Sequence, residues 1–278
     1  MLPWLPRSGF VLASARLVVS PASCGLASLA LPARSADAQM TCLMMMFMGD
    51  LSPRDTRILK LVAAFGQLTG GQLARLVFHE RKGDSPRDRV LRRLVGHKLL
   101  AYVEHRQIGG WRSGSAQYVY QLGTAGRKLC DERRYRGHGT AINRHGLAIA
   151  DVFVSLVEAE RTGRLKMTDF IPEPGCHEEV ERIKLTPDAR FELETSQSTA
   201  SYWLEMDMGT ERAPQLADKC RRYWHTYKLK HSDFPTVLFV APDAERVRFI
   251  QGVVEGGPDE AQDLFQVVEL RNLLDIIN

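Results

Sequence analysis

Three carboxylates in the stretch from Leu185 to Lys219 have the types and spacing that divalent-metal chemistry requires. Asp188 belongs to one short alternating run, and Glu205 and Asp207 share one face of the next run if both are strands. Pairing of the two strands would bring the three side chains to one patch of the sheet. Clustered carboxylate oxygens are the hard ligands that Mg²⁺ prefers, and a bound Mg²⁺ supports phosphodiester chemistry. The stretch therefore predicts a magnesium site formed by these three residues.

The helix that follows this patch supplies a nearby cation. Pro214 suits the first turn of that helix. Its apolar stripe at helical spacing consists of Leu216, Cys220, Tyr223 and Tyr227. Lys219 lies beside the stripe rather than opposite it, so its ammonium group could reach the carboxylates. The alternative interpretation is structural: Glu205 and Asp207 then form a solvent-facing strand side, with Lys219 as their salt-bridge partner.

The elements around this site alternate between helices and strands. The sequence predicts a helix over about 141–160, strands at 165–171, 236–241 and 265–270, and a helix from the Pro242-Asp243 pair to Val253. The run at 236–241 is continuously apolar, as expected of a strand buried on both faces. This half therefore predicts an α/β fold in which helices cover a mixed sheet.

The first half of the chain has a different pattern. Helices are expected from Ser52-Pro53 to Phe65, from Gln72 to Phe78, and from Ser85-Pro86 to about Lys98. Strand-like runs follow at 100–106 and 117–122, with a glycine-rich turn between them. Three helices followed by a β-hairpin predict a winged helix-turn-helix, whose third helix would lie in the major groove.

Basic residues gather on the predicted third helix and on the hairpin. The expected DNA contacts among them are Arg87, Arg89, Arg92, Arg93, Lys98 and Arg112. A stripe of this kind can neutralise phosphates and release counterions. The alternative is a solvated basic face used for protein contacts. Because the charges fall on the helix and the wing together, the pattern favours binding of double-stranded DNA.

The composition is that of an ordinary soluble protein and sets wide bounds. The 278 residues suffice for two domains, and 44% are hydrophobic and 25% charged, with a mild net charge of +4. The five cysteines are scattered without a CxxC pair. That distribution argues against a disulfide framework or a zinc ribbon and favours a reducing cytoplasm.

The first 48 residues differ from the rest of the chain. They contain a single acidic residue, Asp37, and end in a cluster of methionines that closes with Met48. Prolines interrupt the apolar interval within them, so no membrane span is predicted. Disorder, or translation that begins near Met48, explains this segment better than a targeting signal. The predicted organisation is an extension at 1–48, a winged-helix domain at 51–130 and an α/β domain at 141–278.

The order and spacing of several segments resemble the replication-relaxation family of plasmid and mobile-element proteins. In the first half these segments are LSPRDTRILKLVAAFGQLTGGQLARLVF and YQLGTAGRKL. In the second half they are RHGLAIADVFVSL, LTPDARFEL and WLEMDMGTERAPQLADKCRRYWHTYK. The resemblance covers most of residues 51–278. It implies a winged-helix domain followed by a restriction-endonuclease-like domain of the PD-(D/E)xK type, with a part in plasmid replication or mobilisation.

The resemblance also assigns roles to the residues of the acidic stretch. Pro187-Asp188 matches the PD of the nuclease pattern and Glu205 matches the (D/E), but Asp207 stands where the pattern has lysine. In such a nuclease the carboxylates hold Mg²⁺, and the lysine orients the attacking water and offsets developing charge. Lys219 is the candidate substitute for that lysine.

The sequence is therefore consistent with three functions. The first is a DNA-binding protein of replication or mobilisation that also nicks DNA with Mg²⁺, with replication or mobilisation proteins as further partners. The second is an accessory DNA-binding protein without catalysis or metal. The third is a winged-helix transcription regulator, which would bind one defined operator tightly. Cleavage of supercoiled DNA distinguishes the first from the second.

Overall fold

The structure is a computed structural model that describes residues 51–80, 85–103, 117–130, 141–195, 198–230 and 234–275. The predicted extension at 1–48 and the hairpin segment with Arg112 lie outside the described residues. Contacts group the described residues into two compact units, which divide between Glu158 and Ala159. We call them the N-terminal unit and the C-terminal unit and describe each by itself.

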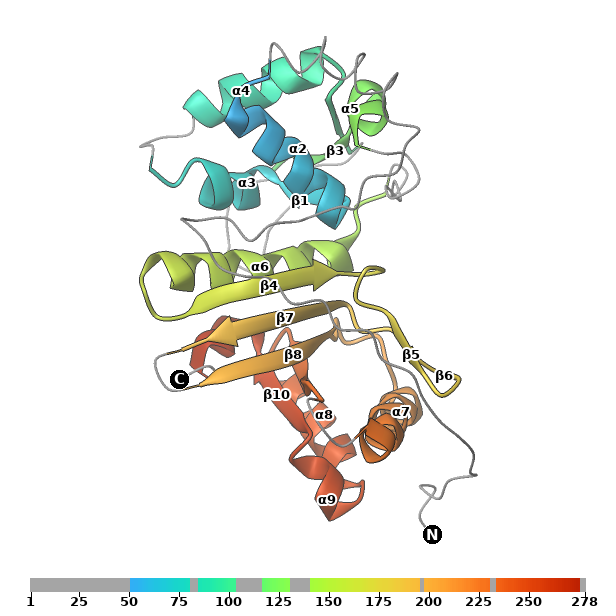
Figure 1. The fold of residues 1–278 in the computed structure, drawn as a ribbon. Helices are drawn as coiled ribbons and strands as arrows, with labels where there is room; N and C mark the ends of the chain where they lie inside the picture. Colours follow the sequence, from blue (N-terminus) through green and yellow to red (C-terminus); the bar gives the residue numbers. More distant parts are fainter. Residues whose placement is uncertain are drawn as a thin grey trace. The chain divides into compact units, whose positions relative to one another are not determined.

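The N-terminal unit combines helices with a small antiparallel sheet (Figure 1). Its elements are α2 (Pro53–Phe65), β1 (Gln67–Thr69), α3 (Gly70–Val77), α4 (Ser85–Gly96), β2 (Leu100–Tyr102), β3 (Val119–Leu122), α5 (Thr124–Leu129) and most of α6 (Arg144–Arg161). The three strands lie in the order β1-β3-β2, and both neighbouring pairs are antiparallel. Strand β1 was not predicted, because its three residues have the pattern of a loop that precedes a helix.

Helix caps explain where the first helices begin. The Ser52 side chain accepts a hydrogen bond from the Asp55 backbone N–H, and the Asp55 carboxylate accepts one from the Ser52 N–H. Gly66, with φ 73°, follows the last turn of α2, so the predicted helix has the expected bounds. The same reciprocal cap, made by Thr69 and Gln72, begins α3 two residues earlier than predicted.

Helix α6 carries polar side chains that bind α3. The Gln72 amide donates to an Asp151 carboxylate oxygen at 2.9 Å, and Arg75 Nε donates to Glu158 at 2.7 Å. The sequence interpretation placed this helix in the second domain, as a cover for the sheet there. All four residues in these contacts belong to the N-terminal unit, which therefore includes most of α6.

The C-terminal unit is built on a mixed sheet. Its elements are β4 (Lys166–Pro172), β5 (Glu178–Val180), β6 (Ile183–Leu185), β7 (Ala189–Glu194), β8 (Thr199–Met206), α7 (Ala213–Lys230), β9 (Thr236–Ala241), α8 (Ala244–Glu255), α9 (Asp259–Gln262), β10 (Phe265–Glu269) and the 3₁₀ helix η1 (Leu270–Asp275). The sheet order is β10-β9-β8-β7-β4. Strands β4, β7 and β8 are antiparallel neighbours, whereas β8, β9 and β10 run parallel. The predicted α/β fold is confirmed.

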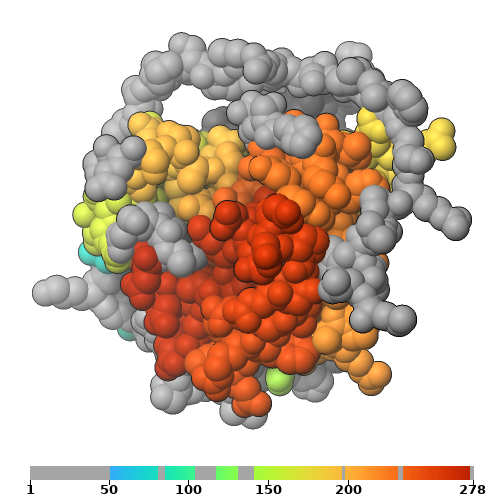
Figure 2. Space-filling view, turned by 90° about the horizontal axis from the view of Figure 1, so that it is seen from below, coloured from blue at the N-terminus to red at the C-terminus, as the bar shows by residue number. Residues whose placement is uncertain are grey.

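A buried core joins one face of this sheet to α7 and α8. It contains Trp203 of β8, Phe239 of β9, Tyr223 of α7 and Ile250 of α8. Figure 2 shows the outer surface of the unit, where the orange α7 region borders the redder region of α8 and α9, and α7 and α8 contact each other. The β5–β6 hairpin and α9 were not predicted, because their short runs carry no clear periodicity.

Candidate functional site

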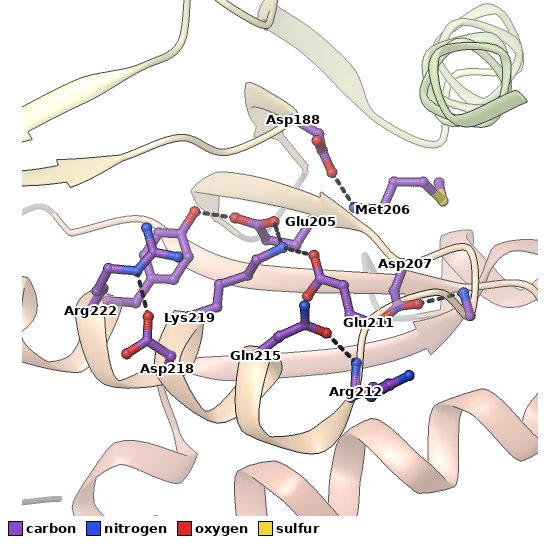
Figure 3. Close-up of polar contacts among 12 residues, drawn as sticks. Asp188, Glu205, Met206, Asp207, Glu211, Arg212, Gln215, Asp218, Lys219 and Arg222 are labelled. Atoms are coloured by element: carbon purple, nitrogen blue, oxygen red, sulfur yellow. Dashed lines mark hydrogen bonds and ion pairs between the residues drawn. The ribbon is translucent and has the colours of Figure 1, made fainter. Parts of the chain in front are cut away.

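Glu205 lies at the centre of a buried polar cluster between β8 and α7. Its side chain is on the same strand face as Trp203, whose ring centroid is 5.4 Å from that of Tyr223. Glu205 is 2% exposed, and each of its oxygens accepts a hydrogen bond. Lys219 Nζ donates to Oε2 at 2.7 Å, and the Tyr223 hydroxyl donates to Oε1. Figure 3 shows Lys219 extending from α7 between Glu205 and Glu211.

Burial and neighbouring charges set the protonation of this cluster. Burial raises the pKa of Glu205 to about 7; the positive charge of Lys219 opposes that rise, and the negative charge of Asp188 adds to it. Burial acts to lower the pKa of Lys219, but Glu205 and Glu211 together raise it above its ordinary value. Lys219 therefore stays protonated, while Glu205 titrates near neutral pH.

Asp188 is held next to Glu205 by the main chain of β8. Its backbone N–H donates to the Leu204 carbonyl at 2.9 Å, and its Oδ2 accepts from the Met206 N–H at 2.6 Å. These two bonds hold the Asp188 carboxylate against the backbone of β8, the strand that carries Glu205. Asp188 is thus near enough for its charge to act on Glu205, and Lys219 binds Glu205 directly. The catalytic roles that the sequence suggested for these three residues stay predictions.

Asp207 forms an ion pair with an arginine of α8. Arg246, in the first turn of α8, donates from Nε at 3.0 Å and from Nη2 at 2.7 Å to the two Asp207 oxygens. Asp207 also accepts from the Gly209 N–H at 2.6 Å, and its side chain is turned toward that loop in Figure 3. Asp207 therefore pairs with Arg246 rather than joining Asp188 and Glu205.

Three residues of this region were missed by the sequence interpretation as site residues. Glu211 accepts from Lys219 at 2.9 Å, Tyr223 binds Glu205, and Arg246 binds Asp207 and the Glu211 carbonyl. Tyr223 could have been found, because it lies four residues after Lys219 and therefore on the same helix face. No local signal points to Arg246, which lies 39 residues after Asp207.

The carboxylates of the predicted magnesium site have partners within the protein. Both oxygens of Glu205 and both oxygens of Asp207 accept hydrogen bonds from cationic or hydroxyl donors of the protein. Within the described residues, no group of three or more His, Cys, Asp or Glu side chains is placed to hold a metal ion. Asp188 accepts from the main chain, Glu205 binds Lys219 and Tyr223, and Asp207 binds Arg246, so magnesium binding by these residues stays a prediction.

The residues predicted to contact DNA differ in exposure and in their partners within the protein. Arg89, Arg92 and Lys98 are exposed and have no carboxylate partner among the described residues; Arg92 Nε donates to the Asp88 carbonyl at 3.2 Å. Arg89 and Arg92 lie outside the buried face of α4, which consists of Leu91 and Leu94, and Lys98 follows the end of the helix.

Arg87 and Arg93, by contrast, form ion pairs. The Arg87 side chain is 17% exposed and lies 2.8 Å from the Asp88 carboxylate. Arg93 Nη2 donates at 2.6 Å to the carboxylate of Asp55, whose side chain is only 1% exposed. Arg93 therefore links α4 to the N-terminal cap of α2.

Comparison with known proteins gives one match. A family model described as replication-relaxation matches residues 59–237, which include parts of both units. No curated protein and no solved structure matches the chain. In the part of the chain that the structure describes, no helix is both long and apolar enough to cross a membrane. Because the match spans more than half of the chain and both candidate regions, the protein belongs to the replication-relaxation family.

Proposed function

We propose that this protein binds double-stranded DNA through α4 of its N-terminal unit. Membership of the replication-relaxation family indicates a role in replication or mobilisation. The observation that carries the proposal is the exposed pair Arg89 and Arg92, which lie three residues apart on the solvent side of α4. Exposed cations without a carboxylate partner are available to phosphates, whereas cations already paired within the protein are not.

The topology of the N-terminal unit supports this proposal. The element order α2-β1-α3-α4-β2-β3 and the sheet order β1-β3-β2 agree with a winged helix-turn-helix. In that arrangement α4 is the helix presented to the major groove. The buried stripe of α4 packs toward the unit, so its arginine face remains for DNA.

Fluorescence anisotropy with a labelled duplex tests the proposal over a series of salt concentrations. The double variant Arg89→Ala/Arg92→Ala is expected to bind roughly 10- to 100-fold more weakly, with a salt slope smaller by about two. The matched control is Arg221→Ala/Arg222→Ala on α7, where both arginines pair with Asp218. Equal losses in the two double variants, or affinity that does not depend on salt, would contradict binding through α4.

A second function, nicking of DNA, is favoured by one observation. Strands β4, β7 and β8 are antiparallel, α7 follows, and β9 returns parallel to β8, which agrees with the nuclease core that the family resemblance implies. Lys219 also contacts Glu205 as predicted for the substitute lysine. The separate Asp207–Arg246 pair weighs against it, so we place DNA binding without cleavage first.

Supercoiled plasmid separates these two functions. Wild type, Asp188→Ala and Glu205→Ala are incubated with Mg²⁺ or Mn²⁺ and examined for nicked circles. Nicking that both substitutions abolish would establish the nuclease function. Intact plasmid, together with retained duplex binding by wild type, would establish the accessory function.

A further inference from the structure

The guanidinium of Arg246 lies directly against the Asp207 carboxylate, just after the end of β8. Its Nε and Nη2 atoms donate to the two Asp207 oxygens at 3.0 and 2.7 Å, and Nη2 also donates to the Glu211 carbonyl at 2.5 Å. The guanidinium carbon is 4.5 Å from the ring centroid of Phe249, so an aromatic ring also contacts the cation. The side chains of Arg246 and Asp207 are only 13% and 3% exposed. Arg246 therefore binds β8, the loop before α7 and its own helix at once.

A second cation binds the acidic residues next to this pair. Lys219 Nζ donates to Glu205 at 2.7 Å and to Glu211 at 2.9 Å. Glu211 thus contacts both cations, Lys219 through its carboxylate and Arg246 through its carbonyl. The protein therefore supplies positive charge of its own to Glu205 and to Asp207, the two predicted magnesium ligands that β8 and its end contribute.

A guanidinium and a divalent cation are alternative partners for the same carboxylate. The guanidinium stays charged over the whole pH range in which proteins fold, and its parallel N–H groups match two carboxylate oxygens. Mg²⁺ or Ca²⁺ needs the same oxygens, at about 2.0–2.6 Å. A metal ion at Asp207 would have to displace Arg246 and then remain close to its positive charge, which repels it. The donor set around Asp207 does not fit a metal ion while Arg246 occupies it.

We propose that Arg246 takes the place of a divalent cation as the permanent counter-ion of Asp207. Asp207 then binds no Mg²⁺ in wild type, and removal of the guanidinium opens a cation site formed by both Asp207 oxygens and the Glu211 carbonyl. Carboxylate and carbonyl oxygens, completed by water, are ligands that Ca²⁺ accepts in flexible geometry. The inference is independent of the proposed DNA binding, and it removes Asp207 from the metal ligands that the nicking function would use.

The experiment measures the melting temperature of the full chain, freed of metal with EDTA, before and after addition of about 5 mM Ca²⁺ or Mg²⁺. The reference is the double variant Arg246→Ala/Asp207→Asn, which reports any effect of the cations elsewhere on the protein. Relative to this reference, the cations should not shift wild type, whereas Ca²⁺ should raise the melting temperature of Arg246→Ala by about 3 °C. Arg246→Lys keeps a positive charge at the site and should respond as wild type does.

Arg93→Ala in the N-terminal unit is the matched control. It leaves a carboxylate of similar burial without its arginine, because the side chain of Asp55 is 1% exposed. Arg93, however, binds one oxygen of Asp55 and no carbonyl of the residues that the structure describes. Ca²⁺ should therefore not raise the melting temperature of this variant.

Three outcomes would overturn the proposal. A shift in wild type as large as that in Arg246→Ala would show that cations reach Asp207 in the presence of its arginine. No shift in Arg246→Ala would show that the guanidinium does not occupy the place of a cation. An equal shift in Arg93→Ala would show that any unpaired buried carboxylate binds Ca²⁺. Should Arg246→Ala lack a cooperative transition, Ca²⁺ is expected to restore one, and failure to do so counts equally against the proposal.

Discussion

Helices α4 and α7 are both rich in basic residues, but these residues have different partners in the structure. On α4, Arg89 and Arg92 project to solvent without a carboxylate partner among the described residues. On α7, Lys219 binds Glu205 and Glu211, and Lys230 binds Glu178. Two of the four cations on α4 are therefore paired with carboxylates, whereas four of the five on α7 are. The number of cations in a segment does not by itself indicate a nucleic-acid surface.

The largest effect is expected when one cation is removed from each helix and the free energy of unfolding is measured. Lys219→Met is expected to lower the free energy of unfolding by about 3 kcal/mol at neutral pH, because Glu205 must then take up a proton to stay buried and the hydrogen bonds from Lys219 to Glu205 and Glu211 are lost. Arg89→Met, the control on α4, should change it by less than about 0.5 kcal/mol. Urea denaturation measures both. Similar losses in the two variants would refute the distinction between the helices.

The pH dependence of Glu205 tests the same cluster. The folded-state pKa of Glu205 is raised from 4.5 to about 7, so its stabilising contribution is present below 4.5 and is lost as pH rises through about 7. Relative to Glu205→Gln, wild type should therefore lose roughly 3 kcal/mol of unfolding free energy as pH rises through this window. Urea midpoints at a series of pH values give the difference. A difference that stays constant with pH would show that Glu205 ionises normally.

The pKa of Asp55, in the N-terminal unit, is shifted in the opposite direction to that of Glu205. Burial acts to raise the pKa of Asp55, but hydrogen bonds from Arg93 and Ser52 lower it below its ordinary value. The stability that the Asp55 carboxylate contributes is thus present at pH values above its ordinary pKa, and it is lost as pH falls through the folded-state pKa. Asp55→Asn should cost about 1–2 kcal/mol at neutral pH and progressively less in acid. Thermal unfolding across the acid range tests this, with Asp88→Asn on the surface of α4 as control.

The smallest effect is expected at the exposed ion pairs of α7. Asp218 contacts Arg221 at 2.7 Å and Arg222 at 3.5 Å, with side-chain exposures of 55% for Asp218, 34% for Arg221 and 42% for Arg222. Asp218→Asn should change the free energy of unfolding by less than about 0.5 kcal/mol, because water and salt screen such pairs. It should also remove the Asp218 charge from both arginines and strengthen DNA binding slightly if DNA reaches this part of α7. Unchanged DNA affinity would show that DNA does not contact this part of α7.

Local sequence signals determined the elements with clear caps or periods. Ser52 and Gly66 bound α2 because capping and positive φ are properties of a few adjacent residues. The apolar run Thr236–Ala241 gave β9 with its observed bounds, since a strand buried on both faces needs no alternation. The position of Lys219 beside the α7 stripe also predicted its contact with Glu205, because helix geometry fixes which face a residue occupies.

Tertiary structure alone decided which charges became paired. The sequence placed Asp207 in a metal site and Arg93 on DNA, but Arg246 binds the first, and the second binds Asp55, 38 residues earlier. Strand β1 likewise exists because β3, far along the chain, offers it hydrogen bonds. Alternation and capping act over a few residues, whereas the partner of a buried charge is chosen by packing across the fold. The sequence therefore determined the elements and their faces, and the tertiary structure determined which cations were paired with carboxylates within the protein.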